Sequence, residues 1–143
     1  MSERVVFSGK THNTNGKSGA ARSNDGLLDL KLPEPHPAAE NLFGAAWSAC
    51  YMGAIQLAAS QRKVKLPAEL AVDAQIDMHR ADGGAYFLRA RLAVSVPGIE
   101  RDQAQALIEA AHLICPYSKA VHGNVDVTTT LVQPQAAELE PVP

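Results

Sequence analysis

The chain contains 143 residues, of which 46% are hydrophobic and 20% charged, and its formal net charge is -2 at pH 7. This balance is typical of a globular domain and excludes the disordered and fibrous classes of protein. Because the charge has no strong sign and the chain has no run of Lys or Arg, the sequence predicts neither a nucleic-acid surface nor an anionic-membrane surface.

The N-terminal segment gives no sign of a targeting signal. Residues Met1 to Phe7 lack the apolar stretch and the small-residue cleavage site of a signal peptide. No window approaches the ~20 apolar residues of a membrane span. The predicted compartment is therefore the cytoplasm, and no membrane partner is expected.

Residues 5–32 contain two short β-like runs on either side of a polar, glycine-rich stretch from Thr11 to Gly26. In the second run, apolar and charged residues alternate from Leu28 to Leu32, which is the period of two of a half-buried strand. Prolines at positions 33, 35 and 37 end this run, because proline lacks the N–H that a strand donates. A helix is expected directly after them.

A long helix is predicted from Ala38 to about Gln61, a segment without proline. Its apolar residues recur at steps of three and four and define a stripe that we expect to face inward: Leu42, Phe43, Ala46, Ala49, Cys50, Gly53, Ala54 and Leu57. The stripe is rich in Ala and Gly and lets another backbone come close, which indicates a helix at the centre of the fold. Trp47 and Tyr51 flank the stripe and are expected to form core or pocket wall.

A β-hairpin and a second helix are predicted next. Apolar and polar residues alternate over residues 69–78 and 88–96, on either side of a Gly-Gly turn, which predicts two strands with one solvent-facing surface. Glu100 or Asp102 can cap the following helix, which ends at Cys115. After a short turn, Val125, Val127, Thr129 and Leu131 predict a last strand.

The predicted order is β-β-β, long α, β-β, α, β, without an internal repeat. Helices segregated from hairpins favour an α+β fold over a wound parallel sheet. We expect a single domain over residues 1–133, followed by a proline-rich, flexible tail over residues 134–143.

The two cysteines are either small buried hydrophobes or redox-active groups. No second pair of ligands offers a zinc site, and neither a metal nor a cofactor is expected. Cys50 lies in the middle of the long helix on its predicted buried stripe, where a packing cysteine would look the same. Cys115 lies at a helix end before Pro116, where the backbone can move locally without unravelling a core. Any bond between the two would join the two helices.

A thiol that attacks an oxidant must be a thiolate, and burial on an apolar stripe opposes that form because desolvation raises the pKa of a thiol. A cation must therefore be supplied, and Lys17 and Arg22 in the glycine-rich stretch are the candidates. Glu40, at the start of the long helix, can hold such a cation. Ten helical residues place Glu40 about 80° around the helix from Cys50 and ~15 Å along its axis. A folded-over loop or a second subunit must close that gap.

Two blocks of sequence closely resemble the organic hydroperoxide resistance (Ohr) family. They run from Glu40 to Cys50 (ENLFGAAWSAC) and from Cys115 to Val127 (CPYSKAVHGNVDV). The run from Ser23 to Leu30 and the Leu-Pro-Ala segment near Pro67 are similar as well. The likeness covers roughly residues 5–132, and two cysteine-centred motifs in the right order make it specific.

The resemblance implies a cysteine-based peroxidase of the OsmC superfamily. It implies an OsmC-like fold with antiparallel sheets around a long central helix, and an intertwined homodimer whose two active sites lie at the subunit interface. By the same resemblance, Cys50 is the peroxidatic cysteine, Cys115 resolves it to a disulfide, and Glu40 and a cation assist the thiolate. The implied substrate is an organic hydroperoxide, and the implied reductant is a dithiol on a lipoylated protein.

The sequence departs from the family pattern at two places. Lys17 stands where the family's catalytic Arg is expected, and it carries the charge without the bidentate fork. On chemical grounds Arg22 is the favoured cation, because its planar guanidinium can bind Glu40 through two bonds and still present an N–H to the sulfur, whereas the family alignment favours Lys17. The second departure is at Ala38-Ala39, where the family commonly has Asn-Pro. It changes the start of the helix but leaves the carboxylate of Glu40 in place.

Two other functions remain open: an OsmC-type peroxidase of broader peroxide range, and a non-catalytic redox-sensing dimer. Apolar side chains near Cys50 favour a hydroperoxide with a hydrocarbon tail over hydrogen peroxide. The five histidines form no metal-ligand spacing and are assigned no role, and Tyr117 and Ser118 are expected at most to order the loop around Cys115.

Overall fold

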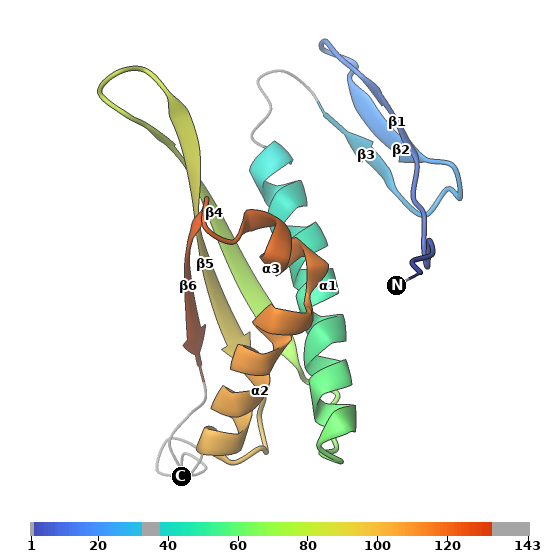
Figure 1. The fold of residues 1–143 in the computed structure, drawn as a ribbon. Helices are drawn as coiled ribbons and strands as arrows, with labels where there is room; N and C mark the ends of the chain where they lie inside the picture. Colours follow the sequence, from blue (N-terminus) through green and yellow to red (C-terminus); the bar gives the residue numbers. More distant parts are fainter. Residues whose placement is uncertain (1, 33–37, 133–143) are drawn as a thin grey trace, which may run out of the picture. The chain divides into compact units, whose positions relative to one another are not determined.

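The computed structural model of the chain describes residues 2–32 and 38–132 (Figure 1). The chain divides into two compact units, Met1–Ala39 and Glu40–Pro143, and each is described by itself. The predicted flexible tail at residues 134–143 lies outside the described residues, and the single domain over residues 1–133 stays a prediction.

The first unit is an antiparallel sheet of three short strands in the order β1-β2-β3. These strands are Thr11–Thr14, Ala20–Ser23 and Asp29–Lys31. The strand expected from Leu28 to Leu32 is confirmed as β3. Strands β1 and β2 lie inside the stretch from Thr11 to Gly26, interpreted from the sequence as a polar connection between strands. The first β-like run is wrong, because Val5 and Phe7 are outside any strand and are 80% and 93% exposed. Strands β1 and β2 have four residues each and lack the alternation of apolar and polar residues by which strands are recognised.

Helix α1 spans Ala38–Gln61 and confirms the long helix. Its predicted inward stripe is wrong for most of its members, since Ala54 alone among the eight is buried and Leu42 and Cys50 are half-buried. The buried side chains include Trp47, Tyr51 and Ile55, whereas the small residues Ala46, Ala49 and Gly53 are exposed. Large aromatic side chains gain much more from burial than Ala or Gly, so they set which face of the helix turns inward.

By length and composition alone, Ala39–Gln61 of α1 is apolar enough to cross a membrane, which corrects the expectation that no segment approaches this limit. Many alanines give the helix this hydropathy without any long run of large apolar residues. Of its most apolar window, 44% is buried inside the protein.

The second unit contains a sheet with the order β4-β5-β6. Strands β4 (Ala71–Arg80) and β5 (Tyr86–Ser95) form the predicted antiparallel hairpin. Strand β6 (Asp126–Leu131) pairs with β5 in parallel, so the expectation of antiparallel sheets holds for every other strand pair of the described residues. The physical reason is the crossover, because a helical connection returns the chain in its original direction.

The crossover contains helix α2 (Arg101–Ile114) and the short helix α3 (Pro116–Val121). Glu100 is the N-cap of α2, and its carboxylate accepts a hydrogen bond from the Gln103 N–H at 3.1 Å. The core lies where α1 and α2 meet one face of the sheet. Its large side chains that are at most 1% exposed include Trp47, Tyr51, Ile55, Leu92, Val94 and Ile108.

Candidate active site

The two cysteine thiols lie side by side in the second unit. The Sγ of Cys115 donates a hydrogen bond to the Sγ of Cys50 at 3.3 Å, and both cysteines are free. Cys115 is fully buried, whereas Cys50 is only half-buried at the margin of the core. A disulfide bond is about 2.05 Å long, so the two sulfurs need to approach by little more than an ångström to be joined. The pair can therefore form a disulfide bond after a small movement.

Cys115 lies at the junction of two helices. It is the C-cap of α2, where its N–H donates to the Ala111 carbonyl at 2.8 Å, and the N-cap of α3. Its sulfur accepts a hydrogen bond from the Ser118 N–H at 3.4 Å. Pro116 stands at the start of α3, where its missing N–H is no loss and its fixed φ suits a helix. Local sequence therefore places the thiol of Cys115 at a defined corner of the chain.

The environment of Cys50 opposes its ionisation. Burial raises the pKa of the Cys50 thiol, and its hydrogen bond with Cys115 raises the pKa further, while the backbone N–H of Tyr117 acts in the opposite direction. A thiolate at Cys50 therefore needs a nearby positive charge, as the sequence indicated.

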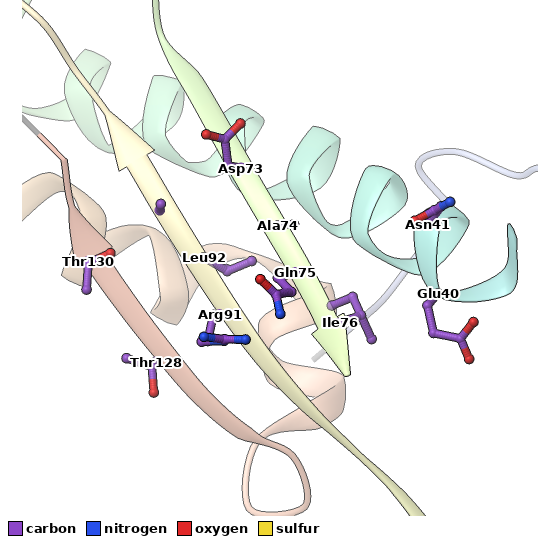
Figure 2. Close-up of a pocket in the computed structure, with 11 residues that line it drawn as sticks. Glu40, Asn41, Asp73, Ala74, Gln75, Ile76, Arg91, Leu92, Thr128 and Thr130 are labelled. Atoms are coloured by element: carbon purple, nitrogen blue, oxygen red, sulfur yellow. The ribbon is translucent and has the colours of Figure 1, made fainter. Parts of the chain in front are cut away.

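Glu40 lies in the first turn of α1, where it is half-buried. It lines a cavity of about 560 Å³ together with Asn41 and with side chains of the sheet, including Gln75 and Arg91 (Figure 2). Cys50 does not line this cavity, and ten residues of continuous helix separate the two by ~15 Å along the axis. Within the second unit, Glu40 and Cys50 are therefore not brought together.

Lys17 and Arg22 belong to the first unit. Lys17 is exposed in the connection between β1 and β2. Arg22 lies on β2 directly opposite Asp29 of β3, and its Nε donates to the Asp29 carboxylate at 3.0 Å. The guanidinium thus already has a carboxylate partner that sequence reasoning did not foresee.

Sequence reasoning also missed a hydrogen-bonded group beside the cysteines. Ring nitrogen Nδ1 of His112 lies 2.9 Å from the Ser118 Oγ, and Nε2 lies 2.7 Å from the Thr129 Oγ1. The Trp47 Nε1–H donates to the same Ser118 Oγ at 3.0 Å. A signal for this group is present in the sequence. His112 stands three residues before Cys115, in the last turn of α2, and Ser118 stands three residues after it, in the first turn of α3, so a contact between them could be expected. Trp47 is confirmed as a core residue.

Metal-ligating residues do not gather in the residues that the structure describes: over 2–32 and 38–132, no three or more His, Cys, Asp or Glu side chains could hold a metal ion together. The chemistry that these residues offer is that of the thiol pair.

Comparison with protein families matches residues 32–130 to the family described as "OsmC-like protein". The chain is 37% identical over 138 residues to the organic hydroperoxide resistance protein of Xanthomonas axonopodis pv. citri, covering 90% of this chain and 96% of that protein. It is 33% identical over 135 residues to the organic hydroperoxide resistance protein OhrB of Bacillus subtilis, covering 89% and 98%.

Solved structures agree with these sequence matches. The crystal structure of OhrB from Bacillus subtilis superposes with a TM-score of 0.79 at 32% identity, over 90% of this chain and 100% of that one. An organic hydroperoxide resistance protein from Elizabethkingia anophelis gives a TM-score of 0.82 at 30% identity, over 92% and 100%. The fold described above is therefore shared with these proteins.

Proposed function

The chain belongs to the organic hydroperoxide resistance family of the OsmC superfamily, and from this premise we propose that it is a thiol peroxidase that reduces organic hydroperoxides to alcohols. The observation that carries the proposal is the contact of 3.3 Å between the Sγ atoms of Cys50 and Cys115. The half-buried Cys50 is the thiol that attacks, and the fully buried Cys115 is the thiol that resolves.

The proposed reaction has three steps. The Cys50 thiolate attacks the distal oxygen of the hydroperoxide, the O–O bond breaks, and the alkoxide leaves as the alcohol after taking a proton; the sulfur becomes a sulfenic acid. The Cys115 thiol then condenses with the sulfenic acid, which releases water and forms the Cys50–Cys115 disulfide. A dithiol finally reduces the disulfide by thiol exchange and is itself oxidised. The proposed reductant is a dihydrolipoyl group on a lipoylated protein.

We assign the activation of Cys50 to a cation of the first unit. Arg22 is engaged with Asp29, which makes Lys17 the better candidate for a charge directed at a thiolate. Glu40 is proposed to hold that cation in the site. Such a charge would offset the burial that raises the pKa of the Cys50 thiol.

We propose that the substrate carries a hydrocarbon tail. The face of α1 that bears Cys50 also bears Phe43 and Leu57, each about two turns away on either side, and these are 37% and 48% exposed. Ala46 and Gly53 on the same face are exposed too. Apolar contacts of this kind favour an alkyl or lipid hydroperoxide over hydrogen peroxide.

The same face supports a homodimer. Among the described residues, no atom outside the helix lies within 4 Å of where a Cβ of residue 53 would stand, so the face around Gly53 has room for a second α1. A second chain could also supply the carboxylate and the cation that Cys50 does not contact within its own second unit.

Sedimentation at micromolar concentration tests the homodimer. We expect Gly53→Leu to leave the monomer folded and to weaken the dimer, because the larger side chain fills the space for a second α1. Gly53→Ala is the matched control. A fully active wild-type monomer would contradict the proposal.

Steady-state assays test the proposed reaction. With dihydrolipoamide as the dithiol, we expect continuous consumption of cumene hydroperoxide and much slower consumption of hydrogen peroxide. Equal rates with the two oxidants would point to a peroxidase of broader range. Formation of the disulfide without turnover would instead point to a redox sensor.

A further inference from the structure

We propose that His112 is a positioning residue for the resolving step: through Ser118 it holds the start of α3 so that the Cys115 sulfur stays within reach of Cys50. The proposal rests on the peroxidase function proposed above. Both ring nitrogens of His112 contact hydroxyl groups, and no hydrogen bond joins the ring to either sulfur among the described residues. The effect of His112 is therefore expected on the geometry of the cysteine pair rather than on the attack itself.

One imidazole joins the elements around the thiol pair. His112 lies in α2, its Nδ1 is 2.9 Å from the Oγ of Ser118 in α3, and its Nε2 is 2.7 Å from the Oγ1 of Thr129 in β6. Ser118 in turn accepts a hydrogen bond from the indole of Trp47 in α1, at 3.0 Å. The His112 ring thereby ties α3 to α2 and to the sheet, while the Trp47 indole ties α3 to the helix that carries Cys50.

Ser118 transmits this position to the sulfur. Ser118 is buried, with a relative exposure of 7%, and its backbone N–H donates to the Cys115 Sγ at 3.4 Å. The same residue thus binds His112 with its hydroxyl and Cys115 with its backbone. Movement of Ser118 away from His112 would carry the first turn of α3, and the Cys115 sulfur bonded to it, away from Cys50.

The packing of α1 against α2 does not depend on this bond. The Tyr51 hydroxyl donates to the Ile108 carbonyl of α2 at 2.7 Å, and both residues are fully buried. The Tyr51 ring also packs on the His112 ring, with centroids 4.4 Å apart. A polar substitution at His112 is therefore expected to loosen α3 without separating the two long helices.

The surroundings of His112 suit an uncharged ring. Burial lowers the pKa of His112, so it is neutral at neutral pH, and a neutral imidazole donates through one nitrogen and accepts through the other. Two hydroxyl groups satisfy both roles. A cavity of about 640 Å³ lies beside the ring, and its other ionisable groups are Lys119 of α3, His122 in the following loop and Asp126 of β6. The Tyr51 phenol, whose pKa is raised by burial, packs on the His112 ring from α1.

Two substitutions separate the contacts of the ring. His112→Asn keeps an amide atom near the position of Nδ1 and can still bind Ser118, whereas His112→Gln places its amide near the position of Nε2 and retains only the contact with Thr129. His122→Asn is the matched control, because His122 lines the same cavity but is exposed.

The experiment follows single turnover in two phases: oxidation of Cys50 by cumene hydroperoxide, and formation of the Cys50–Cys115 disulfide, both by quenched alkylation and mass measurement. We expect all variants to oxidise Cys50 at the wild-type rate. His112→Gln should slow disulfide formation by roughly fivefold to tenfold, as for the loss of one or two hydrogen bonds, and should accumulate sulfenic and sulfinic acid. His112→Asn should stay within about twofold of the wild type, as should His122→Asn.

Equal resolving rates in His112→Gln and the wild type would overturn the proposal, and so would an equal loss in His112→Asn and His112→Gln. A parallel arm with diamide, which oxidises thiol pairs without a hydroperoxide, keeps the test independent of the proposed function. If the wild type forms the disulfide with diamide but does not consume hydroperoxide, the peroxidase fails while a slow His112→Gln still supports the positioning role.

Discussion

Polar side chains are held differently in the two units: the Arg22–Asp29 pair of the first unit is 69% exposed on both sides, whereas the His112 ring of the second unit is half-buried between two hydroxyl groups. Exposed ion pairs contribute at most about 1 kcal/mol, because water and salt compete with them, whereas a broken buried hydrogen bond costs about 1–3 kcal/mol. The geometry of the thiol pair is therefore expected to depend on the second unit. The first unit is expected to act through its charges.

The largest effect should come from the attacking thiol in the second unit. We expect Cys50→Ser to abolish hydroperoxide reduction, because a hydroxyl is not ionised at neutral pH and does not attack the O–O bond. Cys115→Ser should still complete one oxidation and leave Cys50 as a sulfenic acid open to over-oxidation. Single-turnover consumption of hydroperoxide by the two variants measures this, and consumption by Cys50→Ser would refute the assignment.

The next largest effect should be on the free energy of unfolding, which a leucine substitution in the second unit should lower more than one in the first. Leu92 of β5 is 1% exposed and Leu30 of β3 is 38% exposed. Leu92→Ala should lower the free energy of unfolding by about 2–5 kcal/mol, because it removes buried methyl groups and leaves a cavity. Leu30→Ala should change it much less. Urea unfolding measures both, and equal losses would show that the first unit is buried in the working assembly.

The charges of the first unit should act on reactivity and little on stability. We expect Lys17→Ala to raise the apparent pKa of Cys50 and to slow its alkylation at neutral pH by roughly tenfold, because the thiolate loses its compensating cation. Arg22→Ala should have a mild effect, since its guanidinium is paired with Asp29. The pH dependence of Cys50 alkylation tests this. A larger shift in Arg22→Ala would reverse the assignment, and no shift in either would exclude activation from this strand pair.

The smallest effect concerns pH and His112. Burial lowers its pKa in the folded state, so the unfolded chain binds more protons once the pH falls below about 6.5, the ordinary pKa of histidine. The contribution of His112 to the free energy of unfolding is therefore fully present above that pH. It is lost as the pH falls toward the lowered pKa, with a slope of at most about 1.4 kcal/mol per pH unit. Urea unfolding between pH 5 and about 7.5 should show this slope in the wild type and a weaker one in His112→Asn. An unchanged slope would show that other groups cause it.

Local signals in the sequence determined most elements and the place of Cys115. Prolines before residue 38 and periodicity after it predicted α1 with its observed bounds, and alternation around a Gly-Gly turn predicted the β4–β5 hairpin. The acidic cap at Glu100 and the Cys-Pro pair marked both ends of α2. These features depend on a few neighbouring residues, and so they can be read without knowing what the chain packs against.

Tertiary structure decided the rest, because it depends on contacts between distant residues. Periodicity predicted an inward face of α1 around Ala46, Ala49 and Gly53. The burial of Trp47 and Tyr51 in the core instead turned these three small residues outward. The crossover through α2 and α3 made β6 parallel to β5. Only the folded chain brings the sulfurs of Cys50 and Cys115 to 3.3 Å and places His112 between Ser118 and Thr129, since hydrogen bonds and disulfides form only within a few ångströms.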